Sequence, residues 1–242
     1  MEQQQEKHSS SNIALKLALA FATCIILGAV LVMVYCSYKN NIKIQYIYKY
    51  KEANSVLLKA LKASQKANGD LTSWDYSENQ TQENFAKKYI LPYIFVAKDC
   101  GTKKGAGCFA KNKEYKYLNE EPSGLILDDS DGYKFKNKDG ISFLVKFIPS
   151  CISLDQYCFQ IYTDINGPMQ GPSQFGKDLF VFNAYPYTNE FKPYGTYSND
   201  KKSFDPYTSH WKKYPEVSDC TEGGLGLTCG TRLILDGYEM NY

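Results

Sequence analysis

Residues 17–35 read LALAFATCIILGAVLVMVY, a run of 19 residues without a charge or a proline. As an α-helix this run would be about 28 Å long, close to the hydrocarbon thickness of a bilayer. A helix of this length in a soluble core would carry a polar stripe, and the run carries none. We therefore expect a membrane-spanning helix. A cleaved secretory signal is the alternative, although its apolar stretch is shorter, about 7–15 residues, and ends at a small-x-small site.

The sequence around this run divides the chain into four parts. Residues 1–12 are polar and predict a disordered cytoplasmic tail, and residues 13–38 form the expected transmembrane helix. Over residues 39–69, apolar side chains recur at three- and four-residue spacing, which predicts an amphipathic helix. No proline or glycine lies between Ala29 and Gln65. The span and the amphipathic stretch are therefore expected to form one helix, followed by an extracytoplasmic domain over residues 70–242.

Charge gives little sign of a nucleic-acid partner, and it conflicts with the cysteines on orientation. The 28 basic and 26 acidic residues are well mixed, whereas a nucleic-acid partner would require a clustered basic face. More lysines follow the span than precede it, which by the positive-inside tendency would place the C-terminal side in the cytoplasm. Long domains cross membranes largely regardless of flanking charge. We therefore expect a single-pass protein, held in the membrane by residues 13–38, with a cytoplasmic N-terminus and the domain at the cell surface or in a periplasm-like space.

The cysteines favour an oxidising compartment. Six of the eight lie beyond the span in three sequence-local couples. These couples are Cys100 with Cys108, Cys151 with Cys158, and Cys220 with Cys229. None is a CxxC pair and the chain has only two histidines, so a structural zinc site is not expected. We expect three small disulfide-closed loops. Six buried free thiols are the alternative, because sequence does not fix connectivity.

Hydrophobic periodicity in the second half of the chain changes to two, which predicts antiparallel strands. The expected strands cover residues 124–127, 133–135, 141–148, 157–163 and 179–183. Asp131-Gly132 and Asp139-Gly140 stand where hairpin turns belong. A short helix is expected over Thr81–Leu91, and residues 184–218 are typical of a long irregular loop. The fold class is therefore α+β, with a long N-terminal helix packed on an antiparallel sheet.

Two acidic clusters are candidate cation sites. Asp164, Asn166 and Asp178 offer oxygen ligands of the kind that calcium binds, but the third carboxylate and distal glutamate of an EF-hand are missing. The alternative is a turn in which the aspartate and asparagine side chains bond their own backbone. Asp128, Asp129 and Asp131 are interpreted as a solvated hairpin tip. No other cofactor is expected.

Several local motifs are similar to those of known proteins. Residues 164–182 read DINGPMQGPSQFGKDLFVF. Further motifs are Gly69-Asp70 before Trp74-Asp75, the Tyr89–Pro92 stretch before Cys100-Gly101, and the ending from Cys229 through Asp236-Gly237 to Tyr242. Together with a helix that is first apolar and then amphipathic, these motifs resemble the type IV pilin and type II secretion pseudopilin family over roughly residues 40–242. The resemblance implies a pilin-like fold, and other pilin subunits or assembly proteins as partners; a calcium site also occurs in some pseudopilins.

The N-terminus departs from the family pattern. Prepilins have a leader ending in glycine and a glutamate five residues into the mature chain. Here no glycine precedes the apolar run, and no acidic residue lies between Lys7 and Lys51. A monomeric anchored protein, a minor subunit and a diverged copy all remain compatible with this departure.

Catalytic motifs give little support to an enzyme. Of the two histidines, His8 lies in the expected tail, and His210 has no nucleophile-elbow glycine pattern beside it. We therefore expect a non-enzymatic, membrane-anchored, pilin-like structural subunit of a type IV pilus or a type II secretion-like assembly. The alternative is a membrane-anchored surface module without a filament role, which would bind glycan or protein through the Tyr-rich loop between Ala184 and Tyr214.

Overall fold

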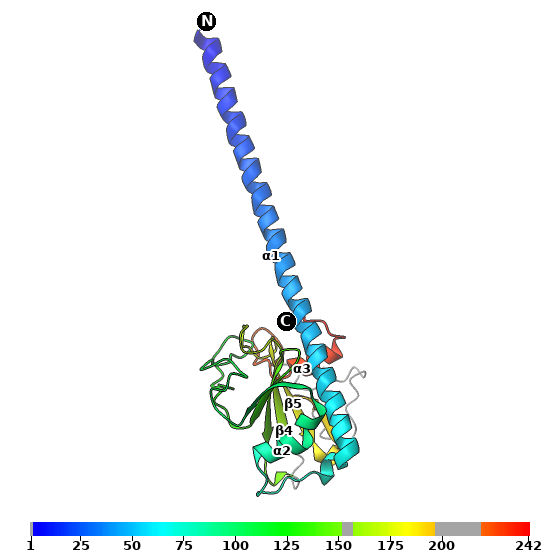
Figure 1. The fold of residues 1–242 in the computed structure, drawn as a ribbon. Coiled ribbons are helices and arrows are strands. Elements are labelled where there is room, and N and C mark those ends of the chain that lie inside the picture. The colour runs from blue at the N-terminus through cyan, green and yellow to red at the C-terminus, as the bar shows by residue number, and fades with distance from the viewer. Residues whose placement is uncertain (1, 152–156, 197–218) are drawn as a thin grey trace. The chain divides into compact units, whose positions relative to one another are not determined.

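One helix, α1, takes up the first quarter of the chain. In the computed structural model, which describes residues 2–151, 157–196 and 219–242, α1 extends from Glu2 to Asn68 (Figure 1). Residues 2–12 of the expected tail are the first residues of α1 in this structure. Glutamate and glutamine are good helix formers, so the polar tail extends the helix that follows it. The continuous helix predicted across the span and the amphipathic stretch is present.

The apolar part of α1 is long enough to cross a membrane. Of the helices in the described ranges, it is the one with the length and composition of a membrane span, although a signal sequence would meet the same criteria. Its side chains from Phe21 to Tyr35 are exposed on all sides. The chain divides into two compact units, Met1–Gln45 and Tyr46–Tyr242. We call the second the head unit, and the C-terminal part of α1 belongs to it.

The head unit contains a six-stranded sheet in which every neighbouring pair is antiparallel. The strands follow one another across the sheet in chain order. They are β1 (Val96–Gly101), β2 (Tyr133–Asn137), β3 (Ser142–Phe147), β4 (Phe159–Asp164), β5 (Leu179–Tyr185) and β6 (Glu190–Pro193). The helix and this sheet confirm the α+β class.

Three of the strand predictions need correction. Residues 124–127 form no strand, because the backbone there bonds to a neighbouring loop: the Tyr115 amide donates to the Leu125 carbonyl. The position beside β2 is taken by β1, which was expected only as a lead into the first cysteine loop. Residues 184–196 are not wholly irregular, because they contain β6; residues 197–218 of that expected loop lie outside the described residues. The Asp139-Gly140 hairpin turn between β2 and β3 is present.

The main core lies between one face of the sheet and the helices. Cross-strand rows of large side chains cover this face, such as Val145, Ile161 and Phe182. The predicted stripe of α1 packs against it, with Tyr50, Leu57 and Leu61 buried. The Tyr50 ring lies 4.5 Å from the Phe180 ring, and Figure 1 shows α1 passing beside β5.

Two short helices and three disulfides complete the head unit. The first helix, α2, spans Gln82–Tyr89 and is capped by the Thr81 hydroxyl, which accepts from the Asn84 amide at 3.0 Å. The second, α3, spans Cys229–Leu235. The three expected disulfides are present: Cys100–Cys108, Cys151–Cys158 and Cys220–Cys229. Cys24 and Cys36, on α1, are free and exposed.

Candidate functional site

The second face of the sheet carries polar side chains within a smaller core. Cross-strand pairing places Ser142 beside Asp164, and Asp164 beside Leu179. The loops over residues 102–131 and 165–178 contribute to this core, with Tyr115, Leu127 and Phe175 buried in it. Asp164 therefore ends a strand inside the protein, where its charge is poorly solvated.

The structure brings Asp164, Asn166 and Asp178 together through the loop that joins β4 to β5. Asp164 Oδ1 accepts from the backbone amides of Asn166 (3.2 Å) and Gly167 (2.9 Å). Asp178 accepts from the Ser173 amide at 2.7 Å, the Gln174 amide at 2.6 Å and the Asn166 side-chain amide at 3.2 Å. Each carboxylate therefore holds one end of the loop by bonding its backbone.

Tyr115 completes this site, although no pattern in the sequence indicates its role. Its hydroxyl donates to Asp164 Oδ2. Burial, reinforced by the nearby Asp164 carboxylate, raises the pKa of the Tyr115 phenol well above its usual range. Burial, reinforced by the Asp178 charge, raises the pKa of Asp164 to about 7. Burial also raises the pKa of Asp178, against its backbone hydrogen bonds.

The donor set favours the turn alternative over calcium. Calcium takes about 6–8 oxygen ligands. Both oxygens of Asp164 and both of Asp178 already accept hydrogen bonds from the loop or from Tyr115, and only Asn166 Oδ1 is buried without a partner. Within residues 2–151, 157–196 and 219–242, no group of three or more His, Cys, Asp or Glu side chains is placed to hold a metal. These hydrogen bonds are those of the turn alternative, and a calcium ion at this position would have to replace them.

The buried carboxylates make the stability of the head unit depend on pH. The pKa of Asp164 is about 7 when folded, against about 3.9 when unfolded. The folded state thus holds a proton that the unfolded state releases, so stability falls as pH rises through this window. We expect the free energy of unfolding to fall by roughly 2 kcal/mol between about pH 5 and pH 8. Chemical denaturation of the full-length protein in detergent at several pH values measures this.

Asp164→Asn is the matched variant for this prediction. It keeps an acceptor oxygen for the two loop amides but cannot ionise, so its stability should vary much less over the same pH range. A wild-type stability that rises with pH would contradict the prediction. Calcium added at either pH should leave the unfolding midpoint unchanged.

The other acidic cluster differs from its prediction. Asp128 is only 1% exposed, so it does not lie on a solvated hairpin tip, whereas Asp129 and Asp131 are exposed. Neither carboxylate oxygen of Asp128 accepts a hydrogen bond from a described residue. Lys134 is also buried; burial lowers the pKa of its ammonium, and the Asp128 charge acts in the opposite direction. The sequence did not indicate the burial of Asp128 and Lys134, because charged side chains are usually exposed.

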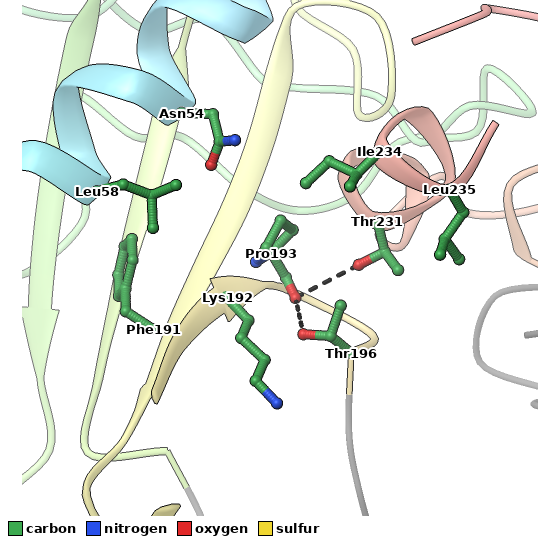
Figure 2. Close-up of a pocket in the computed structure, with 9 residues that line it drawn as sticks. All are labelled: Asn54, Leu58, Phe191, Lys192, Pro193, Thr196, Thr231, Ile234 and Leu235. Carbon is green, nitrogen blue, oxygen red and sulfur yellow. Dashed lines mark hydrogen bonds between the residues drawn. The ribbon is translucent and has the colours of Figure 1, made fainter. Parts of the chain in front are cut away.

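A pocket of about 200 Å³ lies where α1, β6 and α3 meet. Figure 2 shows Asn54 above Pro193, with Leu58 and Phe191 on one side and Ile234 and Leu235 on the other. The hydroxyls of Thr196 and Thr231 both donate to the Pro193 carbonyl, at 2.7 and 3.4 Å, so these threonines are already bonded. The pocket is therefore mainly apolar.

No protein-family model, curated protein or solved structure matches this chain.

Proposed function

We propose that the protein is a non-enzymatic, membrane-anchored structural subunit of a type IV pilus or type II secretion-like assembly. The observation that carries the proposal is the change along α1. Its side chains are apolar and exposed on all sides over residues 21–35, whereas from Tyr50 onward one stripe of the same helix is buried against the sheet. One helix thus supplies both the membrane segment and part of the head core.

The disulfides support the orientation in this proposal. Three disulfides in a head unit of this size are typical of proteins that fold in an oxidising compartment. We therefore place the head unit outside the cytoplasm and the N-terminus inside. The pilin-like arrangement is inferred from the helix, the antiparallel sheet and the local motifs together.

Oxidative cross-linking through the native Cys24 and Cys36 tests the assembly. The two free cysteines are 12 positions apart on α1, about 18 Å along the helix axis. If α1 helices pack in a staggered array, Cys24 of one copy meets Cys36 of the next, and copper–phenanthroline treatment of membranes should give a ladder of multimers. The single variants Cys24→Ser and Cys36→Ser should give no ladder, because each removes one partner of the Cys24–Cys36 contact.

Membranes from cells that naturally produce the protein must be used, since they hold any assembly machinery. Monomers alone in these membranes would overturn the assembly proposal and favour an anchored binding module. Cysteine labelling of the exposed head residue Tyr187, as Tyr187→Cys in the Cys24→Ser/Cys36→Ser background, checks orientation. A membrane-impermeant maleimide should label it in intact cells, or after outer-membrane permeabilisation where an outer membrane exists.

A further inference from the structure

The loop between β4 and β5 contains one of the two Asn-Gly pairs of the chain, Asn166-Gly167; the other is Asn68-Gly69. In such a pair the glycine nitrogen can attack the side-chain carbonyl of the asparagine, because glycine has no side chain to hinder its approach. The product is a cyclic imide, a succinimide, which water opens to aspartate or isoaspartate. What surrounds each pair therefore decides how readily its asparagine loses ammonia.

The nitrogen of Gly167 has a proton acceptor beside it. Its N–H donates to Asp164 Oδ1 at 2.9 Å, so a carboxylate lies where it can take the proton that the attacking nitrogen must lose. Gly167 has a φ of +75°, and a Cβ at this position would come within 2.5 Å of the Gly140 carbonyl oxygen. The fold therefore requires glycine here, and with it the least hindered attacking nitrogen.

The nitrogen that would leave has acceptors around it. Asn166 Nδ2 donates to the Gly171 carbonyl at 2.9 Å and to Asp178 Oδ2 at 3.2 Å. This nitrogen becomes positively charged when it takes up a proton before departure, and acceptors already in place around a developing charge favour such a step. Asn166 Oδ1 is buried and accepts no hydrogen bond from a described residue. The side chain is thus held through its leaving nitrogen and not through its carbonyl oxygen.

We propose that Asn166 deamidates within the folded head unit, with Asp164 as proton acceptor and Asp178 stabilising the leaving nitrogen. Gly167 N gives its proton to Asp164 and forms a bond to Asn166 Cγ. The Cγ–Nδ2 bond breaks, and Nδ2 leaves as ammonia with the proton that Asp164 returns. Water then opens the succinimide, so the modification uses no oxidant, reductant or second enzyme.

The modification would weaken the loop that these bonds hold. An aspartate or isoaspartate at position 166 has no side-chain N–H, so the bonds to Gly171 and Asp178 are both lost. The new carboxylate also stands beside Asp178, where like charges repel each other. We therefore expect the converted protein to have a lower unfolding midpoint than the unconverted protein.

A comparison of folded and unfolded protein tests the proposal. Full-length protein is incubated at neutral pH in detergent, with or without urea, and mass spectrometry of its peptides follows conversion at Asn166 and Asn68. A folded backbone ordinarily slows this reaction, because it restrains the approach of the nitrogen to the side chain. We expect the reverse at Asn166, with conversion about tenfold faster in the folded protein. Asn68 is the internal control and should react more slowly when folded, because its Nδ2 donates to Ser64 and Tyr93 and none of these acceptors is a carboxylate.

Asp164→Asn isolates the proton acceptor. It keeps an oxygen for the Gly167 N–H but lacks the carboxylate, so conversion at Asn166 should slow about tenfold in the folded protein and stay unchanged in urea. Asp129→Asn removes an exposed carboxylate and should leave both rates as in the wild type. Circular dichroism checks that each variant is folded, and the comparison with urea decides the question if Asp164→Asn is not. Slower conversion at Asn166 in the folded than in the unfolded wild type, or equal folded rates in wild type and Asp164→Asn, would overturn the proposal.

Discussion

Replacing Trp74 with alanine is expected to lower the free energy of unfolding of the head unit by about 3–5 kcal/mol. The indole stacks on Tyr89 of α2, with ring centroids 4.4 Å apart, and on Phe159 of β4 at 5.8 Å. Its Nε1 also donates to the Gly69 carbonyl at 3.0 Å, just beyond the end of α1. Truncation would thus open a cavity where helix, helix and sheet meet. Denaturant unfolding of the full-length protein in detergent, followed by circular dichroism, measures the loss.

Phe95→Ala is the control for Trp74→Ala. Phe95 is also a large aromatic residue, but it is exposed, so its replacement should change the stability by no more than about 0.5 kcal/mol. A similar loss from both changes would show that the aromatic cluster around Trp74 is not the packing centre that we describe.

Asp178→Ala should destabilise the head unit by about 3–4 kcal/mol, because it leaves three donors in and around the loop without their acceptor. These donors are the Ser173 and Gln174 amides and the Asn166 side chain. Relief from burying a charge offsets part of the loss, since burial raises the pKa of Asp178. The unfolding midpoint at neutral pH measures the effect. In addition, the backbone amides of residues 166–174 should exchange hydrogen faster.

Two substitutions separate this hydrogen-bonding role from simple loss of negative charge. Asp178→Asn retains an acceptor oxygen and should be clearly milder than alanine, and Asp129→Ala removes a carboxylate that is exposed and should be nearly neutral. A wild-type protein that gains stability from calcium, with the gain lost in Asp178→Ala, would instead show that the loop binds the metal.

The long helix and most of the sheet could be predicted because their patterns are strong and local. The stripe from Tyr50 to Leu61 and the Asp139-Gly140 turn follow from residue spacing and turn chemistry alone. Residues 124–127 show why another strand prediction failed. Leu125 and Leu127 alternate with other side chains as in a strand, and both pack in or against the smaller core. Their backbone nevertheless forms no strand. The alternation therefore indicated which side chains are buried, but not that the backbone pairs with a neighbouring strand.

The candidate site was predicted in part. Asp164, Asn166 and Asp178 lie close together in sequence, and short loops that bond their own backbone can be read from such spacing. Tyr115 and Lys134 could not be assigned to their neighbours, because Tyr115 meets Asp164 across 49 positions and the fold alone brings them together. The Asn54 pocket combines three elements from both ends of the chain, so no local pattern indicates it.

The order of the six strands has a consequence for how the head unit is made. Each strand pairs with the one synthesised just before it, and the three disulfides join cysteines only 8, 7 and 9 positions apart. Contacts between near neighbours in the chain form quickly, because little loop entropy is lost in closing them. A head unit that folds as its chain is synthesised can therefore add its strands one at a time and close each cysteine couple as it appears. Each new strand covers the open edge of the strand before it, and covering exposed edges limits aggregation during folding.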